Sequence, residues 1–339
     1  MTIITATPTR IPFIFPVPTF ITFNDICFSP DPDCCRMIRV SSGKVGETMK
    51  LVAIDMDGTL LHTEKEISDY TISAIQRLQR EGHAFIIATG RTMQDAKNIV
   101  TTAGIPADGY ICANGATIAD HNGHLLAEKH LGLHVATDIA SWLHERHFYF
   151  HLATSEGLYT TADAYQFFLD DLNEYAREKD DGGKMAAIIR DQADRQLNNM
   201  GVKMLPAPED IPSYDFTAYK FLVLSLFPQK LQTIRTAWEA NPSIALTSSG
   251  RDNIELMPVD AEKGSGLTMM AKQLGFTPEN TIAIGDNYND LSMFETAGFS
   301  IAMGNAEGDV KQYADTETAD NDTDGVAKAI ETHILGIRQ

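Results

Sequence analysis

Cysteine is scarce in this chain, and its placement excludes a disulfide framework. Four cysteines occur among 339 residues, and three of them, Cys27, Cys34 and Cys35, lie in the first 48. Cys112 stands alone in the rest of the sequence. A body with a single cysteine has no internal cross-link and is typical of a reducing compartment. We therefore expect a cytoplasmic protein.

The sequence also lacks a basic excess and a long hydrophobic run. Lys and Arg number 27 against 46 Asp and Glu, which gives a formal net charge of -19. Such a field repels a phosphate backbone, so we expect no nucleic-acid partner. No apolar stretch approaches the length of a membrane-spanning helix, so we expect no membrane partner either. Any phosphate site must carry its own positive charge, from a metal, a lysine or backbone N–H groups.

The first 48 residues differ from the rest in composition. They contain six of the chain's 14 prolines, and prolines interrupt the apolar stretch 11–20. A secretory signal would keep such a stretch unbroken. The three cysteines here have neither the paired spacing nor the nearby histidine of a zinc site. We interpret residues 1–48 as a poorly ordered or non-native leader, with the folded body starting at Met49.

Short apolar runs alternate with amphipathic stretches from Met49 onward. The runs predict buried strands at residues 51–54, 84–88, 110–113, 281–284 and 299–302. Ser68 and Thr92 stand where the N-caps of two intervening helices are expected. Strands that are apolar throughout and separated by helices indicate a parallel sheet covered on both faces. The predicted fold class is therefore α/β, with a Rossmann-like doubly wound parallel sheet.

The middle of the chain interrupts this alternation. Residues 131–257 are more polar, with helical stretches at 161–179 and 229–240 and strands at 220–226 and 253–257. We interpret this segment as an inserted α/β cap domain. The catalytic core then consists of residues 49–130 and 258–339.

Acidic residues stand where two of the predicted strands end. Asp55 and Asp57 follow the first strand, and Asp286 follows the strand at 281–284. In an open α/β sheet, ligands bind beyond the carboxyl ends of the strands. Carboxylates gathered there repel one another unless a cation lies between them, and their hard oxygens suit Mg²⁺. A plain turn at 57–59 and helix capping near Asp286 are the alternatives for each motif taken alone.

Two further elements offer hydrogen-bond donors or positive charge for a phosphate. Thr89 and Gly90 end another strand at the start of a helix, where a hydroxyl and an exposed N–H form an anion site. Lys263 precedes a helix that has Leu267 and Met270 on its apolar side. An ordinary N-terminal turn and a solvated lysine are the respective alternatives.

Taken together and in this order, these residues resemble the haloacid dehalogenase superfamily of phosphotransferases. Its four motifs are matched by residues 55–60, by residues 88–91, by Lys263 and by residues 285–290. The sequence is similar in particular to the Cof-type branch, at residues 114–116, 254–258 and 324–326. The resemblance covers residues 49–339 and none of the leader.

The resemblance implies a role for each matched position. Asp55 would attack the phosphorus, while Asp57 would protonate the leaving group and then activate water. Mg²⁺ would be held by Asp55, the backbone carbonyl of Asp57 and Asp286. The phosphoryl oxygens would be held by a set of donors, namely Thr89, Lys263, Asn289 and the N–H groups of Met56, Asp57 and Gly90. Asp290 would steady Lys263 and the residues around the metal.

The function implied is Mg²⁺-dependent hydrolysis of small phosphate monoesters, with sugar phosphates as the expected class, through an aspartyl-phosphate. The expected partner is a small phosphorylated metabolite. A sugar phosphomutase is the nearest alternative, since it keeps the phosphate on the sugar. A non-catalytic phosphosugar-binding or regulatory protein is the alternative from another class. It would be expected to have lost Asp55, Asp57, Lys263 or Asp286, and all four are present.

Two other polar clusters have simpler interpretations. The sequence His144-Glu145-Arg146-His147 lacks the His-Glu-x-x-His spacing of a zinc site, so it predicts a polar helix face in the cap. The acidic run 315–324 lacks the glycine and the terminal glutamate of an EF-hand, so it predicts a solvated loop.

Overall fold

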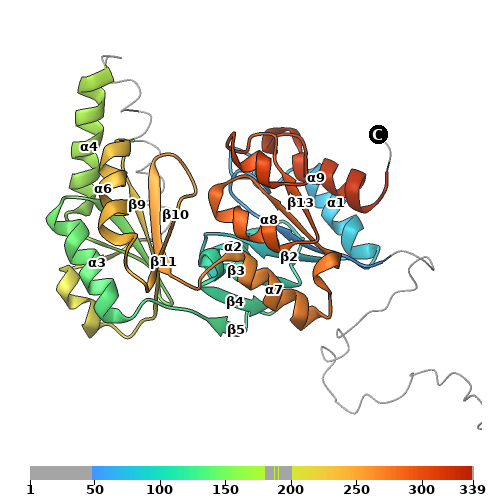
Figure 1. The fold of residues 1–339 in the computed structure, drawn as a ribbon, viewed down its shortest axis with the longest axis horizontal. Coiled ribbons are helices and arrows are strands. Elements are labelled where there is room, and N and C mark those ends of the chain that lie inside the picture. The colour runs from blue at the N-terminus through green and yellow to red at the C-terminus, as the bar shows by residue number, and fades with distance from the viewer. Residues whose placement is uncertain (1–47, 180–186, 188–189, 191–200, 338–339) are drawn as a thin grey trace, which may run out of the picture. The chain divides into compact units, whose positions relative to one another are not determined.

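The structure, a computed structural model, describes residues 48–179, 187, 190 and 201–337. The leader predicted at residues 1–48 lies outside the described residues except for its last position. In the part of the chain that the structure describes, no helix is long and apolar enough to cross a membrane. The helices and strands form two sets, each built on a sheet of its own (Figure 1).

The first sheet has eight strands in the order β14-β13-β12-β1-β2-β3-β4-β5. Its strands are β1 (Leu51–Ile54), β2 (Ala84–Ala88), β3 (Gly109–Cys112), β4 (Thr117–Asp120), β5 (Leu125–Glu128), β12 (Thr281–Gly285), β13 (Phe299–Ala302) and β14 (Thr316–Glu317). β1 pairs in parallel with both β2 and β12, and every residue of β1 and β12 is buried. The predicted α/β class with a parallel core is thus confirmed.

The sheet departs from the predicted all-parallel arrangement at one edge. β4 pairs antiparallel with β3 and with β5. The chain reverses between β3 and β4 at Ala113, Asn114 and Gly115, whose φ angles are 48°, 57° and 95°. Asparagine and glycine tolerate this left-handed conformation better than other residues. The reversal depends on these three backbone angles, which hydrophobic periodicity does not report.

Helices cover both faces of this sheet. They are α1 (Asp69–Arg80), α2 (Met93–Thr102), α7 (Lys263–Leu274), α8 (Leu291–Thr296) and α9 (Gly325–Ala329). As predicted, Ser68 and Thr92 cap α1 and α2, because their side chains accept hydrogen bonds from the N–H groups of Thr71 and Asp95.

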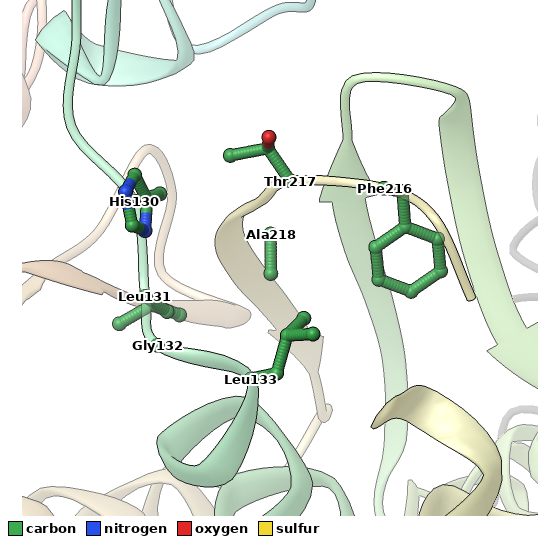
Figure 2. Close-up of a pocket in the computed structure, with 7 residues that line it drawn as sticks. All are labelled: His130, Leu131, Gly132, Leu133, Phe216, Thr217 and Ala218. Atoms are coloured by element: carbon green, nitrogen blue, oxygen red, sulfur yellow. The ribbon is translucent and has the colours of Figure 1, made fainter. Parts of the chain in front are cut away.

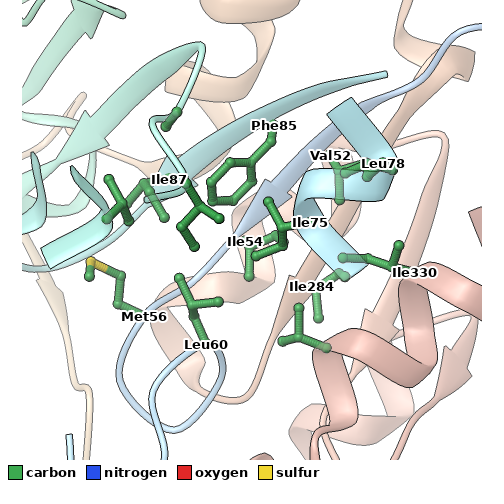
Figure 3. Packing of buried hydrophobic residues seen from close by; sticks show 14 of the residues in the cluster. Val52, Ile54, Met56, Leu60, Ile75, Leu78, Phe85, Ile87, Ile284 and Ile330 are labelled. Atoms are coloured by element: carbon green, nitrogen blue, oxygen red, sulfur yellow. The ribbon is translucent and has the colours of Figure 1, made fainter. Parts of the chain in front are cut away.

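Successive residues of β1 point to opposite faces of the sheet, as the pleat requires. Val52 and Ile54 pack in one cluster with residues of α1, α2 and α9 (Figure 3). Leu51 and Ala53 pack in a second cluster with residues of α7 and α8. The central strand is therefore held from both sides, which fixes the position of whatever follows its carboxyl end.

The second sheet has six strands in the order β10-β11-β9-β6-β7-β8. They are β6 (Tyr149–Thr154), β7 (Gly157–Thr161), β8 (Lys203–Leu205), β9 (Ala218–Leu224), β10 (Ile244–Thr247) and β11 (Asn253–Pro258), accompanied by α3 (Leu133–Glu145), α4 (Ala164–Lys179) and α6 (Pro228–Trp238). The helix predicted at 161–179 starts later, because Thr161 is the last residue of β7. This sheet has its own core, which includes Phe150, Phe221 and Leu256.

Short helices complete the connections. The 3₁₀ segments are Ala113–Gly115, Pro208–Ser213, Pro278–Asn280, Tyr288–Asp290, Val310–Tyr313 and Asn321–Thr323, and a π-helical turn spans Ile330–Ile334.

Candidate active site

Three buried carboxylates meet beyond the carboxyl ends of β1 and β12. Ile54 and Ile284 are register partners in this parallel pair, so Asp55 and Asp286 leave the sheet at the same edge. Asp290 follows in the short helix Tyr288–Asp290. Oxygen atoms of the three side chains lie within 4.8 Å of one another. Their exposed fractions are 5% for Asp55, 7% for Asp286 and 0% for Asp290.

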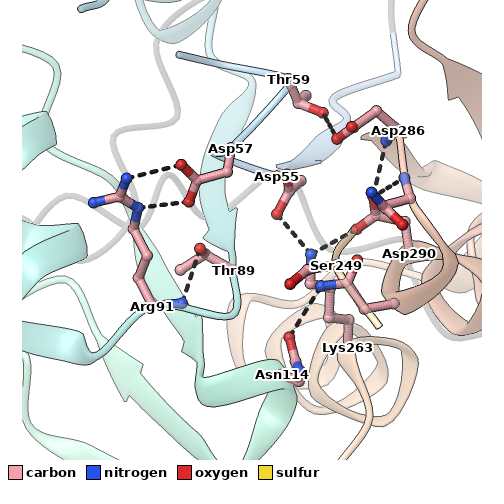
Figure 4. Close-up of polar contacts among 12 residues, drawn as sticks. Asp55, Asp57, Thr59, Thr89, Arg91, Asn114, Ser249, Lys263, Asp286 and Asp290 are labelled. Carbon is pink, nitrogen blue, oxygen red and sulfur yellow. Dashed lines mark hydrogen bonds and ion pairs between the residues drawn. The ribbon is translucent and has the colours of Figure 1, made fainter. Parts of the chain in front are cut away.

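Lys263 supplies the positive charge next to these acids. Its Nζ donates to Asp55 Oδ1 at 2.6 Å and to Asp290 Oδ1 at 2.6 Å (Figure 4). The side chain is fully buried. Burial alone would lower the pKa of Lys263, but Asp290 and Asp55 outweigh it, so that the pKa is raised and the lysine stays charged. The alternative of a solvated lysine at this position is therefore wrong, since Lys263 is a buried cation.

One lysine does not neutralise this cluster of acids. Burial raises the pKa of Asp55 to about 7, although Lys263 opposes the rise. Burial and the neighbouring Asp55 raise the pKa of Asp286 to about 8. The raised pKa values mean that the negative charge of the two carboxylates is not fully compensated. An additional cation at this site would stabilise their ionised forms.

The side chain of Asp57 points away from this cluster and toward Arg91. Arg91 binds it in a bidentate manner, from Nε to Oδ2 at 2.7 Å and from Nη2 to Oδ1 at 2.8 Å (Figure 4). Lys65 adds a third contact at 2.9 Å. Burial would raise the pKa of Asp57, but the hydrogen bonds and charge of Arg91, with Lys65, outweigh it and hold the pKa well below its usual range.

The predicted phosphate-binding residues lie at the ends of β2, β12 and α7. Thr89 is buried, and its Oγ1 accepts a hydrogen bond from the N–H of Arg91 at 3.1 Å. The Asn114 side chain packs closely against the backbone of Gly90, because a Cβ atom added to Gly90 would lie 3.1 Å from Asn114 Oδ1. The Nδ2 of Asn289 donates to the same Oδ1 at 3.2 Å. The Met56 side chain belongs to the hydrophobic core, so only its backbone is available to a ligand.

Comparison with known proteins identifies the family of this chain. The sequence profile of the haloacid dehalogenase-like hydrolases matches residues 52–330. The chain is a haloacid dehalogenase-like hydrolase. Phosphatase YwpJ of Bacillus subtilis (strain 168) is 34% identical over 289 residues, which are 85% of this chain and 100% of YwpJ. The 5-amino-6-(5-phospho-D-ribitylamino)uracil phosphatase YwtE of the same organism is 33% identical over 85% of this chain and 99% of its own length.

A solved structure resembles the fold as well. A haloacid dehalogenase-like hydrolase from B. subtilis matches with a TM-score of 0.74 and 34% identity, over 85% of this chain and 100% of that chain. These relatives give the enzyme class of this hydrolase as a phosphoric monoester hydrolase.

The acid cluster of this hydrolase fits a hard divalent cation. All the ligand atoms that the cluster offers are carboxylate oxygens, which suit Mg²⁺. Both oxygens of Asp290 are engaged, one by Lys263 and the other by the N–H groups of Asp286 and Asn287. Asp55 and Asp286 each have one oxygen engaged by a side chain among the described residues. Asp55 and Asp286 are therefore better placed than Asp290 to bind a metal, whereas both side-chain oxygens of Asp57 are engaged by Arg91 and Lys65.

Close packing holds the loop after β1 against Asp286. Thr59 Oγ1 donates to Asp286 Oδ1 at 2.8 Å. A Cβ atom on Gly58 would lie 2.4 Å from Asp286 Oδ2, and Gly58 has a φ of 79°. Only glycine meets both requirements without strain. Residues 58–60 do form a turn, and within it Thr59 orients the carboxylate of Asp286 while Gly58 leaves room for it.

Two residues of the site were not assigned a role from the sequence. The motif at residues 88–91 includes Arg91 without giving it a role, and no motif includes Lys65. Arg91 immediately precedes Thr92, the N-cap of α2, and also donates to Asp95 at 2.5 Å, four residues further on. The spacing of an arginine and an acid at i and i+4 was the available signal for that contact. Nothing in the sequence indicated that the same guanidinium also holds Asp57.

We expect the Asp57–Arg91 pair to make stability depend on acid pH. A carboxylate with a lowered pKa stabilises the fold above its unfolded pKa of about 3.9, and the contribution is lost as the pH falls through the lowered value. Arg91→Met should return the pKa of Asp57 toward its ordinary range. Thermal melting between neutral pH and pH 2 should therefore separate the two proteins most at neutral pH and least in acid.

Lys65→Met is the matched control for that experiment. Its ammonium contacts the same carboxylate, but its side chain is 58% exposed and that of Arg91 is 19% exposed. Solvent weakens the interaction of Lys65 more, so this variant should follow the wild-type curve more closely. A melting difference between Arg91→Met and wild type that stays constant down to pH 2 would contradict the assignment.

The acidic run near the C-terminus is more than a solvated loop. Asp322 accepts hydrogen bonds from both the N–H and the Oγ1 of Thr63, each at 2.7 Å. Asn321 is buried and donates to the carbonyl of Leu61 at 2.9 Å. The run therefore anchors the loop after β1, and the expectation of a purely solvated loop was wrong. His144, by contrast, pairs with Asp163 at 2.8 Å on the last turn of α3, as a polar helix face would.

A small pocket of about 150 Å³ lies elsewhere, where residues 130–133 run beside residues 216–218 (Figure 2). Leu131 and Ala218 form an isolated antiparallel bridge there. Most of its lining is apolar, and none of its residues belongs to the acid cluster.

Proposed function

We propose that this hydrolase is a Mg²⁺-dependent phosphatase that cleaves small phosphate monoesters, with sugar phosphates as the substrate class, through an aspartyl-phosphate on Asp55. One observation carries the proposal. A buried carboxylate at the end of the central strand is held by an interior lysine and faces a second buried carboxylate, Asp286. Phosphoryl transfer depends mainly on such positioning and on neutralising the charge of the phosphoryl oxygens.

In the first step, an Asp55 oxygen attacks the phosphorus and the ester P–O bond breaks. The leaving oxygen takes a proton from Asp57. Lys263, Thr89, Asn289 and the N–H of Gly90 hold the phosphoryl oxygens. When bound, Mg²⁺ supplies positive charge to these oxygens and to Asp55 and Asp286.

In the second step, water attacks the aspartyl-phosphate while the Asp57 carboxylate takes its proton. Inorganic phosphate leaves, and the Asp55 carboxylate is restored. The Asp57–Arg91 pair favours the ionised form of Asp57, which this second step needs. The first step needs the protonated form, so we infer that substrate binding separates Asp57 from Arg91.

The substrate class rests on relatives. YwtE is named for a substrate whose phosphate is carried on a ribityl chain, which supports a phosphorylated sugar or a similar small metabolite. A cytoplasmic location is also part of the proposal, supported by a single buried free cysteine among the described residues, Cys112.

The test is a panel of sugar phosphates assayed with Mg²⁺ for release of inorganic phosphate. Release of phosphate separates a phosphatase from a phosphomutase, which leaves the phosphate on the sugar. We expect excess EDTA to reduce turnover by about a hundredfold or more, because the buried carboxylates then lack their counter-charge. Added Mg²⁺ should restore it, and EDTA already saturated with Mg²⁺ is the control. Full turnover in excess EDTA would refute the metal requirement.

A further inference from the structure

A buried carboxylate outside the acid cluster joins the second, six-stranded sheet (here called the cap sheet) to the candidate active site. Glu255 lies in β11 and is 1% exposed. Its Oε1 accepts from Ser249 Oγ at 2.6 Å. Its Oε2 accepts from the Nζ of Lys220 in β9 and from the Nδ2 of Asn114, the latter at 2.6 Å. Lys220 and Ser249 belong to the cap segment, whereas Asn114 belongs to the turn between β3 and β4.

Glu255 remains ionised in this setting. Burial would raise its pKa, but Lys220 and the hydrogen bonds from Lys220, Ser249 and Asn114 outweigh it, so that the pKa is lowered. An ionised carboxylate only accepts hydrogen bonds. Its partner atom on Asn114 must therefore be the amide nitrogen, and the orientation of that amide is determined.

The orientation of the Asn114 amide in turn determines which atom it presents to the predicted phosphate-binding residue Asn289. With its nitrogen on Glu255, its Oδ1 faces Asn289 and accepts from Asn289 Nδ2 at 3.2 Å. The same Oδ1 lies 3.1 Å from where a Cβ atom of Gly90 would be, and Lys220 Nζ lies at the same distance. Of the residues that would hold the phosphoryl group, Asn289 is thus oriented by a side chain that Glu255 holds, and Gly90 lies close to the same side chains. The amide of Asn289 is directed to present N–H groups, which a phosphate needs.

We propose that Glu255 is a positioning residue for the phosphate site, acting through Asn114 on Asn289. This inference rests on the proposed function, since it assigns Asn289 to phosphate. It makes phosphate affinity depend on a hydrogen bond between the cap sheet and the turn after β3. The cap thereby contributes to the general phosphate site and not only to the recognition of the rest of the substrate.

Two conservative substitutions separate this role from a charge effect. Glu255→Gln removes the charge but keeps an oxygen that can accept from Lys220 and Asn114. Glu255→Asp keeps the charge but shortens the side chain, so that the carboxylate is withdrawn from Asn114. We expect Glu255→Asp to weaken binding of inorganic phosphate by about fivefold to tenfold, as loss of one hydrogen bond does, and Glu255→Gln to change it by less than about threefold. A purely electrostatic role predicts the reverse order.

The measurement is isothermal titration of the full-length protein with inorganic phosphate in the presence of Mg²⁺. Asp171→Asn is the matched control, because Asp171 is a buried cap carboxylate bound by a lysine and a serine, Lys230 and Ser225, in the same way. No hydrogen bond from a residue of the first sheet to Asp171 occurs among the described residues. This variant should bind phosphate like wild type, and melting curves compare the stability of all the variants.

A double-mutant cycle with Asn114→Gly tests the connection itself. Glycine accepts the φ of 57° at this position, and it removes the amide without changing any charge. Asn114→Gly should weaken phosphate binding about as much as Glu255→Asp. If Glu255 acts through Asn114, Glu255→Asp should have no further effect in the Asn114→Gly protein.

Each outcome decides the proposal. The proposal would be overturned if the losses of phosphate affinity in Glu255→Asp and Asn114→Gly multiplied in the double variant. It would also be overturned if Asn114→Gly bound phosphate with wild-type affinity. If Glu255→Asp does not fold, Asn114→Gly and Asn289→Ala form the cycle instead, and additive losses there overturn the proposal equally. Because binding is measured without turnover, wild-type protein that binds phosphate but hydrolyses no ester would refute the proposed function and leave this inference standing. Wild-type protein that binds no phosphate would refute both.

Discussion

Asp55→Asn should lower turnover by about a thousandfold or more on every phosphate ester. An amide cannot serve as the nucleophile, and the neighbouring acids are unsuitable substitutes. Asp290 has both oxygens engaged by Lys263 and backbone N–H groups, and Asp286 is held by Thr59. Steady-state release of inorganic phosphate, measured with an aryl phosphate and a sugar phosphate, checks this expectation.

The same variant should remain folded, because asparagine has the shape of aspartate and Lys263 keeps its contact with Asp290. Asp315→Asn is a suitable control in the same sheet. Asp315 accepts from the N–H and Oγ of Ser300 at 2.8 and 2.9 Å, and among the described residues it makes no hydrogen bond to a proposed site residue. It should keep near wild-type turnover. Near-normal activity in Asp55→Asn would mean that another group attacks the phosphorus.

Local patterns in the sequence were enough to predict the central elements of the fold. β1 and β2 have the predicted bounds, because a strand buried on both faces is apolar at every position. The caps at Ser68 and Thr92 were also predictable, since a cap is a contact between residues three apart. The antiparallel edge at β4 and β5 was not, because it follows from left-handed backbone angles at residues 113–115.

The candidate site also contains residues that could be predicted from local patterns and contacts that could not. Asp55 and Asp286 could be named because each directly follows a strand, and parallel strands bring their carboxyl ends to one edge. The Arg91–Asp57 contact joins residues 34 apart, and the Asn114–Glu255 contact joins residues 141 apart. Such contacts depend on side-chain directions after two segments have packed. Neither hydrophobic periodicity nor motif spacing carries that information.

Asp57→Asn should produce a different defect from Asp55→Asn. The backbone carbonyl expected at the metal is unchanged, and what is lost is the proton donor of the first step and the base of the second. Removing a general acid and base typically lowers the rate by about a hundredfold to ten-thousandfold. With sugar phosphates both steps should suffer. Aryl phosphates have good leaving groups that hardly need a proton, so their first step should be slowed less than their second.

The phosphorylated form of the Asp57→Asn protein should therefore accumulate with an aryl phosphate. Mass spectrometry of the quenched protein should find an added phosphoryl group on the peptide that contains Asp55. Arg91→Met is the control, because it also breaks the Asp57–Arg91 pair but leaves the carboxyl group in place. It should not accumulate phosphorylated protein to the same extent, since Asp57 can still activate water. A phosphoryl group on any other residue would show that Asp55 is not the nucleophile. Equal accumulation in both variants would show that the pair with Arg91, and not proton transfer by Asp57, governs the second step.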